Sequence, residues 1–345
     1  MLKFIMTMIK IENISSKDKW KALLDQFPEA NFLQSYNWGL FQESMGCLLW
    51  RLAAVKDGRC IALASVYLEK AKRGFYFSCP GGPLFRKEDT EVLGKLTAYL
   101  QLLAKQERAW FFRCRPQLED KAENAKYFKQ RGFLESPLHM SAETTICLDL
   151  LQTEEELLNS MRKNTRYAVR RAEKSNLEFV KSNDPKDVLL LYRLQMETQK
   201  KQGFVPFSLE FLQKQFQAFS PDSEVYIFKI LDKGAACAAA FIIFYRGEAV
   251  YHYAGNSKLA YKNNASYLLQ WKIIKEAKKM GFRYYNLWGI APKGSTGHRF
   301  AGVSIFKSGF GGKVVSYLHA KDFPFSPFYK ITRMFELWRK HQRKL

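Results

Sequence analysis

Two stretches of the sequence contain the same order of expected elements, and this repetition constrains the fold more than any other feature. Each begins with two apolar runs joined by a turn that contains a glycine, Gly58 or Gly234, which is typical of a β-hairpin. A third strand, a loop, a helix and a fourth strand follow in both. The expected ranges are 49–55, 60–67, 74–79, 91–106 and 109–113 in the first stretch, and 224–231, 236–244, 249–255, 266–280 and 283–288 in the second.

Corresponding turns and strands of the two stretches are separated by nearly the same number of residues, which favours a duplicated fold. The alternative is that this order of elements is common and recurs by chance. A hairpin followed by a strand, a helix and a strand predicts a mixed sheet with helices on its faces. This α/β order is that of the N-acetyltransferase (GNAT) fold. The length of 345 residues suits two such domains, expected at 1–150 and 151–315.

The net charge of +22 is the outlier of the composition. It predicts an anionic partner such as nucleic acid, lipid head groups or a phosphorylated substrate, unless the surface is merely basic. Six scattered cysteines indicate free thiols in a reducing compartment. Five histidines without ligand spacing predict no metal site. The N-terminus does not resemble a signal peptide, and no apolar run is long enough to span a membrane. We therefore expect a cytoplasmic protein, with contact to the membrane from that side left open.

A basic helix is expected over residues 153–176, between the two stretches. Thr153 and Glu156 form a capping box, and apolar residues then recur at helical spacing. The opposite face carries cations with few acids between them, which favours an anion-binding face over an ordinary solvated one. Its cations are Arg162, Lys163, Arg166, Arg170, Arg171 and Lys174.

A second basic amphipathic helix is expected at residues 327–345. Its apolar stripe is Phe328, Ile331, Met334, Phe335 and Trp338. We predict that this stripe docks on the first domain. The basic residues around it would then remain free for docking, RNA or an anionic membrane.

The stretch from Gly281 to Tyr317 is the strongest candidate for a functional site. It is expected to form a strand, a long loop and a second strand entered through glycines, with Lys307 beside a Ser-Gly-Phe-Gly-Gly turn. Glycines let a backbone approach a ligand closely, and sites are commonly built on loops at strand ends. The alternative reading, a hairpin whose glycines serve turn geometry, is about as well supported.

The loops in which a GNAT enzyme would hold coenzyme A lack the required pattern. Residues 256–266 contain no glycine, and the Gly-Gly loop after residue 79 has the wrong spacing for a phosphate cradle at a helix N-terminus. Coenzyme A is therefore disfavoured. An aminoacyl-tRNA ester fits better, because its acyl group is activated and its carrier is a polyanion that Lys and Arg bind.

Several segments resemble the FemABX family of aminoacyl-tRNA-dependent transferases, which build peptidoglycan interpeptide bridges. The similar segments are FLQSYNWGLFQ (32–42), MRKNTRYAVRRAEK (161–174), YLLQWKIIKEAKKMGFRYYNLWGI (267–290) and GVSIFKSGFGG (302–312). The resemblance implies two tandem GNAT-like domains, the first completed by a C-terminal helix within 316–345. The long coiled-coil insertion of some members is absent, since residues 184–221 have room only for two ordinary helices.

The resemblance also implies roles for individual residues. Lys307 would be catalytic and stabilise charge at the acyl transfer. Phe306, Tyr261, Trp38 and Gln42 would bind the cell-wall precursor. Arg162, Lys163, Arg166, Arg170 and Arg171 would bind tRNA. The chain departs from the family pattern at three places, with Gln42, Arg115 and Asn286 where other members often have Lys, Asp and Asp.

The function so implied is transfer of an amino acid from aminoacyl-tRNA to a stem-peptide amine of the peptidoglycan precursor, either lipid II or UDP-MurNAc-pentapeptide. We expect a monomer that needs no cofactor beyond the aminoacyl-tRNA co-substrate. Two alternatives stay open at this point. One is a GNAT-type acyltransferase with another donor, and the other is a non-catalytic protein that binds RNA or membranes.

Overall fold

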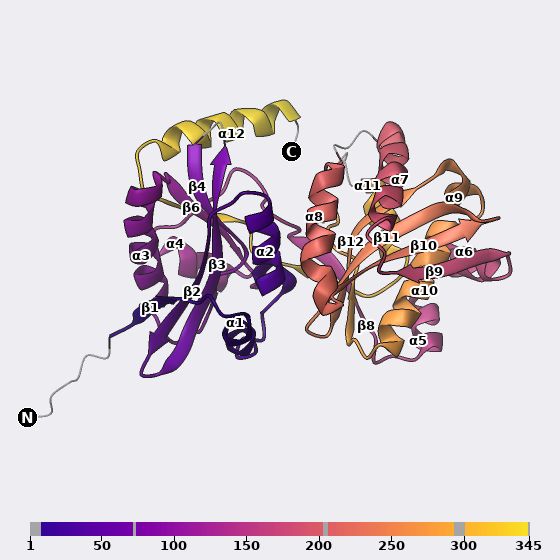
Figure 1. Cartoon of the computed structure of the whole chain (residues 1–345), viewed down its shortest axis with the longest axis horizontal. Helices are drawn as coiled ribbons and strands as arrows, with labels where there is room; N and C mark the ends of the chain where they lie inside the picture. The colour runs from indigo at the N-terminus through magenta and orange to yellow at the C-terminus, as the bar shows by residue number, and fades with distance from the viewer. Residues whose placement is uncertain (1–7, 72–73, 203–205, 293–300, 344–345) are drawn as a thin grey trace, which may run out of the picture. The chain divides into compact units, whose positions relative to one another are not determined.

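The computed structural model describes residues 8–71, 74–202, 206–292 and 301–343. The chain divides into two compact units, residues 1–143 with 316–345, and residues 144–315 (Figure 1). The boundary precedes β8 (Thr144–Asp149), whereas the sequence placed it at residue 150. The difference arises because β8 pairs with β13 (Tyr284–Asn286) and so belongs to the second sheet.

The first unit is a mixed sheet with the order β1-β2-β3-β4-β6-β15-β7, and β5 pairs with β3. Its helices pack on this sheet around a core that includes Phe77, Leu96 and Phe112. Its elements are β1 (Lys10–Asn13), α1 (Lys17–Leu24), η1 (Phe32–Gln34), α2 (Tyr36–Ser44), β2 (Leu49–Lys56), β3 (Arg59–Ala71), β4 (Gly74–Gly81), β5 (Leu84–Phe85), α3 (Val92–Glu107), β6 (Phe111–Pro116), α4 (Ala122–Lys129), β7 (Leu134–Glu135), β15 (Lys321–Pro324) and α12 (Tyr329–Arg343).

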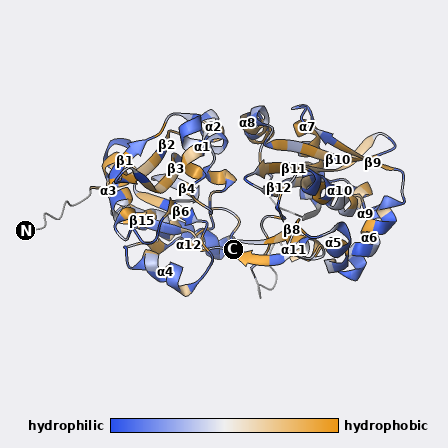
Figure 2. Ribbon diagram, turned by 90° about the horizontal axis from the view of Figure 1, so that it is seen from below, coloured by the Kyte–Doolittle hydropathy of each residue, from blue (hydrophilic) through white to orange (hydrophobic). Residues whose placement is uncertain are grey.

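The second unit is a sheet with the order β14-β8-β13-β12-β11-β10-β9. Figure 2 shows its central strands as hydrophobic and α6 as largely hydrophilic, in keeping with a core on the sheet and a solvated helix face. Its other elements are α5 (Glu154–Ser160), α6 (Lys163–Glu173), β9 (Leu177–Ser182), α7 (Asp187–Gln202), α8 (Leu209–Phe219), η2 (Ser220–Asp222), β10 (Val225–Asp232), β11 (Ala235–Tyr245), β12 (Glu248–Asn256), α9 (Lys258–Lys262), α10 (Ala265–Lys279), α11 (Ala301–Ser308) and β14 (Lys313–Ser316).

The predicted repetition is confirmed. Strands β2, β3, β4 and β6 with α3 correspond in order to β10, β11, β12 and β13 with α10. In both units the hairpin strands are antiparallel, and the strand after the helix is parallel to the strand before it. The region 184–221 forms two ordinary helices, α7 and α8, as expected.

The expected helix over 153–176 is two helices, α5 and α6, because the backbone is extended at Met161 and Arg162. The capping box at the start of α5 is confirmed, with mutual hydrogen bonds between Thr153 and Glu156. The predicted inner face is also found, since Leu157, Met161 and Val169 are buried. The predicted cations therefore belong to α6 and its two flanking residues, and α5 carries none of them.

No helix among the described residues is both long and apolar enough to cross a bilayer.

Candidate active site

An opening between two parallel strands distinguishes the second unit from the first. Strands β12 and β13 pair over only three residues, Glu248–Val250 with Tyr284–Asn286, although β12 continues to Asn256. The equivalent strands of the first unit, β4 and β6, stay paired over six residues. Ligands of open α/β sheets bind at the carboxyl ends of parallel strands where neighbouring strands diverge. The second unit is therefore the one whose sheet offers a site.

Irregular backbone borders this opening on both strands. The register between β11 and β12 shifts between Phe241 and Ile242, which leaves His252 as an extra, bulged residue. Trp288, just after β13, has a φ of 59°, which is uncommon for a large side chain. The His252 and Trp288 rings are 5.4 Å apart in an edge-on arrangement. Bulges and strained residues concentrate at functional sites.

Lys307 projects into this region from the last turn of α11. Its Nζ atom donates a hydrogen bond of 2.7 Å to the carbonyl oxygen of Gly289 and lies 5.7 Å from the centre of the Tyr251 ring. The residue is only 7% exposed. Removal from water disfavours the ammonium form, and this desolvation lowers the pKa of Lys307 to about 7. Lys307 is therefore a group that changes charge near neutral pH at the opening between the strands.

The neighbouring His252 is held in its neutral form. Burial of the ring, followed by the charge of Lys307, lowers the pKa of His252 to about 3. Glu248, also on β12, has its pKa raised to about 7 by desolvation, partly offset by a hydrogen bond from Asn286. At a strand rise of about 3.3 Å per residue, Glu248 lies roughly 13 Å before His252. Glu248 bonds to Asn286 and Lys307 bonds to Gly289, so the two groups have different hydrogen-bond partners.

The glycine-rich segment after Lys307 differs from the expectation. Lys307 lies in a helix and not beside a strand, because Phe306 and Phe310 pack against Tyr267 of α10 at helical spacing. The glycines serve packing of the protein on itself. A Cβ atom at Gly309 would lie 2.2 Å from Thr165 Oγ1, and one at Gly312 would lie 2.7 Å from the Cys147 carbonyl oxygen. The φ of 85° at Gly312 agrees with a role in turn geometry, although the expected hairpin is not formed. Contacts within the unit account for the absence of a side chain at Gly309 and Gly312.

The other predicted precursor-binding residues of the second unit have contrasting environments. Tyr261, on α9, is 43% exposed. It lies close enough to Tyr251 to add to the effect of burial in raising the pKa of that buried phenol. Tyr251 therefore lies near both Tyr261 and Lys307. Phe306 is half-buried against Tyr267 and the core, which gives its ring a packing role in addition to the predicted one.

Trp38 and Gln42 belong to α2 of the first unit, and both are buried. Trp38 packs edge-on against Phe32 and Phe41. The Gln42 amide oxygen accepts from the Cys47 thiol. Their assignment to precursor binding stays a prediction.

The other two departures from the family pattern are interior residues. Arg115 on β6 is fully buried, donates to Gln117 and Ser141, and has its pKa lowered to about 10 by desolvation. Asn286 on β13 donates to Glu248 and accepts from Thr145. Both side chains are engaged within the protein.

The segments in which such a fold would hold coenzyme A differ in local structure between the two units. Residues 258–262 form the short helix α9. In the first unit, a Cβ atom at Gly81 or Gly82 would collide with the side chain of Asn31 or Gln34. The glycines there admit these two side chains, and Gln34 uses the space to bond Ser65 N and Pro80 O.

The predicted tRNA-binding cations separate into two groups. Arg162 donates to the Ile305 carbonyl oxygen and Ser308 Oγ of α11, and Arg166 donates to the carbonyl oxygens of Leu158 and Asn159 at the end of α5. These two arginines therefore fix α5, α6 and α11 to one another. Lys163, Arg170 and Arg171 are exposed and are available to an external anion.

Tyr167 is a residue that the sequence reasoning missed. It lies on the exposed face of α6 among these cations and is 65% exposed. Base–aromatic stacking together with phosphate contacts is the usual combination in single-stranded nucleic-acid binding. An aromatic residue four positions after Lys163 and three before Arg170 was a signal that the sequence contained.

A histidine–carboxylate cluster in the first unit was also missed, because His319 is 176 positions from Glu143 in the sequence. The potential ligand atoms of His139, Glu143 and His319 lie within 4.8 Å of one another. His319 Nδ1 lies 2.8 Å from a Glu143 oxygen, while Nε2 donates to the Ser136 carbonyl oxygen at 2.7 Å. Both ring nitrogens face acceptors, which leaves His319 no lone pair for a metal and favours an imidazolium paired with Glu143.

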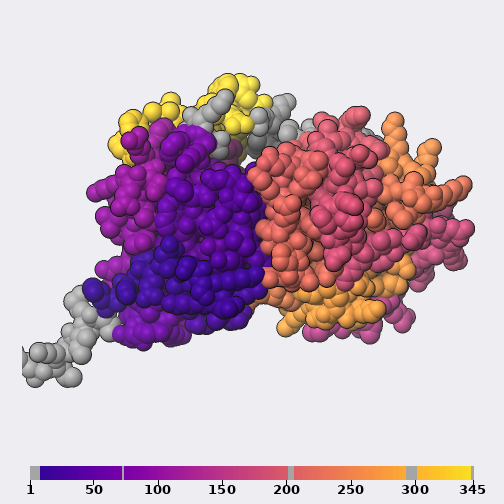
Figure 3. Space-filling view, in the orientation of Figure 1, coloured from indigo at the N-terminus to yellow at the C-terminus, as the bar shows by residue number. Residues whose placement is uncertain are grey.

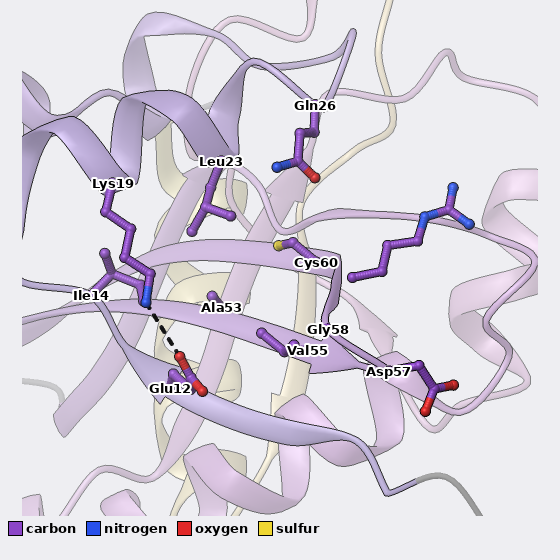
Figure 4. Close-up of a pocket in the computed structure, with 11 residues that line it drawn as sticks. Glu12, Ile14, Lys19, Leu23, Gln26, Ala53, Val55, Asp57, Gly58 and Cys60 are labelled. Atoms are coloured by element: carbon purple, nitrogen blue, oxygen red, sulfur yellow. Dashed lines mark ion pairs between the residues drawn. The ribbon is translucent and has the colours of Figure 1, made fainter.

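A cavity of about 570 Å³ lies in the first unit between α1 and strands β1 to β3 (Figure 4). Lys19 pairs with Glu12 at 3.5 Å on its wall, and Cys60 lies at its base. None of the predicted site residues lines it. The candidate active site is therefore the strand opening at Lys307 and not this cavity.

Two mixed α/β units with the same strand order, one of them opened between its parallel strands, define a tandem GNAT-like protein. The profile of the FemAB family matches residues 16–233 and 229–336, and the chain belongs to this family. It is 36% identical over 105 residues to the aminoacyltransferase FemA of Staphylococcus epidermidis, covering 30% of this chain and 25% of FemA.

Two further comparisons extend over more of the chain. It is 23% identical over 220 residues to the lipid II:glycine glycyltransferase of Staphylococcus epidermidis (strain ATCC 35984 / DSM 28319 / BCRC 17069 / CCUG 31568 / BM 3577 / RP62A), covering 61% of this chain and 53% of that protein. The crystal structure of FemX matches the fold with a TM-score of 0.83 and 17% identity, covering 95% of this chain and 100% of FemX. The chain thus spans from a quarter to about half the length of these curated relatives.

Proposed function

We propose that this protein transfers an aminoacyl group from aminoacyl-tRNA to an amine of the peptidoglycan stem peptide, and that the reaction takes place beside Lys307. The observation that carries the proposal is the buried Lys307 ammonium at the opening between β12 and β13. Family membership supports the reaction class, since the matching relatives are named as an aminoacyltransferase and a glycyltransferase.

The reaction requires stabilisation of a charged intermediate more than activation of the acyl group, because the aminoacyl ester is already activated. The stem-peptide amine attacks the ester carbonyl carbon, a C–N bond forms, and the ester C–O bond then breaks. The proton of the amine leaves with the ribose oxygen of the tRNA. The tetrahedral intermediate carries an oxyanion, and a preorganised cation in a site sheltered from water stabilises it. The hydrogen bond to Gly289 holds the Lys307 ammonium in place and leaves its other N–H groups to donate. Alignment of the two substrates supplies much of the remaining acceleration.

The contacts of α6 support its role in binding the donor. Arg162, just before α6, bonds to Ser308, which follows Lys307 directly in α11. A tRNA acceptor end bound along the exposed cations and Tyr167 would therefore lie on the structure that carries the catalytic lysine. Each phosphate neutralised by Lys or Arg releases counterions, so tRNA affinity should fall steeply with salt.

The acceptor is proposed from the name of one relative and the position of one residue. The glycyltransferase that matches over 61% of this chain is named for lipid II. Tyr261, exposed on α9 next to Tyr251, can contact an acceptor whose amine reaches Lys307. We assign Tyr261 to acceptor binding and propose a lipid-linked precursor over the soluble UDP-linked one.

A transfer assay tests the proposal. The full chain would be incubated with tRNA charged with each of several labelled amino acids, and with lipid II or UDP-MurNAc-pentapeptide as acceptor. The expected result is an acceptor heavier by one aminoacyl residue, formed only with charged tRNA. The mass of the acceptor would stay unchanged with every charged tRNA if the donor were a different one. Acylation of an amine from a thioester by the same protein would then support that other donor.

The donor site is tested separately by binding. Arg170→Gln with Arg171→Gln should weaken tRNA binding. Lys186→Gln with Lys200→Gln removes two exposed cations, one just before α7 and one within it, and should not. Both pairs leave the interior contacts of Arg162 and Arg166 intact. Equal tRNA affinities of the two variants would rule out α6 as the donor site. If the wild-type protein bound tRNA but formed no acylated product with any donor, the non-catalytic alternative would replace the enzyme.

A further inference from the structure

The C-terminal helix α12 buries polar and charged side chains and exposes apolar ones, whereas an amphipathic helix usually buries its apolar face. The residues that it turns toward the first unit are Tyr329, Thr332 and Glu336, each at most 3% exposed. Glu336 bonds to Arg113 of β6, and Tyr329 donates to Asp322 of β15. Hydrogen bonds and buried charges, and not an apolar stripe, therefore attach this helix to the sheet.

The apolar stripe of α12 faces solvent, so the prediction that it docks on the first domain is wrong for the residues within the helix. Phe328, just before the helix, is also exposed but has its ring 5.4 Å from that of Trp110. Figure 3 shows α12 as a ridge on the surface of the first unit, at the yellow end of the colour range. The exposed fractions of the stripe run from 42% to 71%. Spacings of three and four residues place its members on one face of the helix. These residues are Phe328, Ile331, Met334, Phe335 and Trp338.

Cations border this stripe on both sides. At 100° per residue, Lys330 lies on one flank of the stripe and Arg339 on the other. The Arg339 guanidinium carbon lies 5.7 Å from the centre of the Phe335 ring. Long basic side chains beside an apolar stripe can place their charged ends at lipid head groups while their methylene stems cover apolar surface. The whole chain adds a net charge of +22.

We propose that the outer face of α12 binds an anionic lipid bilayer, with its apolar side chains at the boundary between head groups and acyl chains and its cations at the head groups. This is the arrangement of interfacial amphipathic helices, which insert about 5–10 Å. RNA would use the cations but not five exposed apolar side chains. The buried ionic attachment holds the helix to the unit while its apolar face is occupied by lipid.

Membrane binding by α12 has one consequence for catalysis, which rests on the proposed function. A protein held at the bilayer by α12 meets a lipid-linked acceptor at the same surface, so vesicles should accelerate transfer to lipid II. Vesicle binding itself needs neither substrate nor catalysis. Vesicle binding can therefore be absent from a protein that still transfers to a soluble acceptor. It can also be present in a protein that transfers to no acceptor.

Vesicle flotation of the full chain tests the proposal. One set of vesicles contains equal parts of phosphatidylglycerol and phosphatidylcholine, and the other contains phosphatidylcholine alone. We expect binding to the anionic vesicles, at least about tenfold weaker in Phe335→Ser with Trp338→Ser. Leu48→Ser with Leu102→Ser, which removes two other exposed leucines of the first unit, should bind like wild type. Unfolding curves would show that both variants fold.

Charge variants test the second part of the face. Lys330→Gln with Arg339→Gln should weaken binding to anionic vesicles, whereas Lys126→Gln with Lys129→Gln on α4 should weaken it less. Equal vesicle binding by wild type and the Phe335 and Trp338 variant would overturn the proposal. The proposal would also be overturned if the wild type did not bind vesicles but formed a dimer, and this variant were a monomer. The face would then join two copies of the chain. Loss of tRNA binding alone in this variant would also overturn it.

Discussion

Arg113 and Glu336 are 223 positions apart in the sequence, yet the Arg113 guanidinium donates two hydrogen bonds to the Glu336 carboxylate, at 2.7 and 3.1 Å. The same guanidinium donates two more to Asp322, at 2.7 and 2.8 Å. All three side chains are almost fully buried. The cluster joins β6, β15 and α12, and it is the physical reason that the last helix belongs to the first unit.

Glu336→Gln should destabilise the first unit. The substitution keeps the shape of the side chain but removes one of the two charges that compensate Arg113, and breaking a buried ion pair costs about 3–5 kcal/mol. Urea unfolding of this variant is compared with that of Glu123→Gln, a change at an exposed position of α4. Destabilisation no greater than that of the exposed control would show that the cluster does not hold α12.

The pair of His319 and Glu143 should make stability depend on pH. Burial alone lowers the pKa of His319, but the hydrogen bond and charge of Glu143 raise it overall. Burial raises the pKa of Glu143, but His139 and His319 lower it to about 2. The raised pKa of His319 stabilises the fold below about 6.5, and this contribution is lost as pH rises through the folded-state value. The lowered pKa of Glu143 stabilises it above about 4.5, and this is lost as pH falls toward 2.

The stability difference between wild type and His319→Gln should therefore be largest between about pH 4.5 and 6.5 and shrink at higher pH. Denaturant unfolding at a series of pH values measures it. A difference that stays constant from pH 5 to pH 9 would mean that His319 does not pair as an imidazolium.

Gly312→Ala should destabilise the second unit. The residue has a φ of 85°, and an added Cβ would lie 2.7 Å from the Cys147 carbonyl oxygen of β8. A left-handed conformation alone costs a non-glycine residue of order 1–3 kcal/mol. Gly94→Ala in α3 is the matched control, because a Cβ there meets nothing within 4 Å. Glycine within a helix is less stable than alanine by about 0.5–1 kcal/mol, so this substitution should stabilise the first unit. Thermal melting should move in opposite directions for the two variants.

The sequence predicted the repeated sheet order because hairpin turns and apolar runs are local signals. It did not predict α11, where Ser304 and Gly302 weaken the helical signal and contacts of Phe306 and Phe310 with Tyr267 decide the structure. It reversed the faces of α12, since spacing reveals an apolar stripe but not which face is buried. That choice depends on Arg113, which no local pattern connects to Glu336.

The candidate site was predictable in part for the same reason. Lys307 was identified as a residue, but the three features that define its environment are tertiary. They are the short pairing of β12 with β13, the bulge at His252 and the carbonyl of Gly289. The basic face of α6 was predicted from charge patterning, whereas the interior bonds of Arg162 and Arg166 required the break between α5 and α6.

The ionisation of Lys307 gives its role a distinct pH signature. Desolvation lowers its pKa to about 7, so the ammonium form is present below pH 7 and is lost above it. The ratio of wild-type to Lys307→Ala transfer rates should fall as pH rises through about 7, because ionisation of the acceptor amine affects both proteins equally and cancels. A ratio that rises with pH would mean that the neutral amine acts as a base.

The single-turnover rate of aminoacyl transfer by Lys307→Ala, measured at pH 6.5 with saturating charged tRNA and acceptor, tests the central claim most directly. Removing one preorganised group that stabilises an oxyanion costs about 10²–10³ in rate, and we predict a loss of this size with unchanged tRNA binding and unfolding curves. A rate within a few-fold of wild type would contradict the placement of the reaction at Lys307.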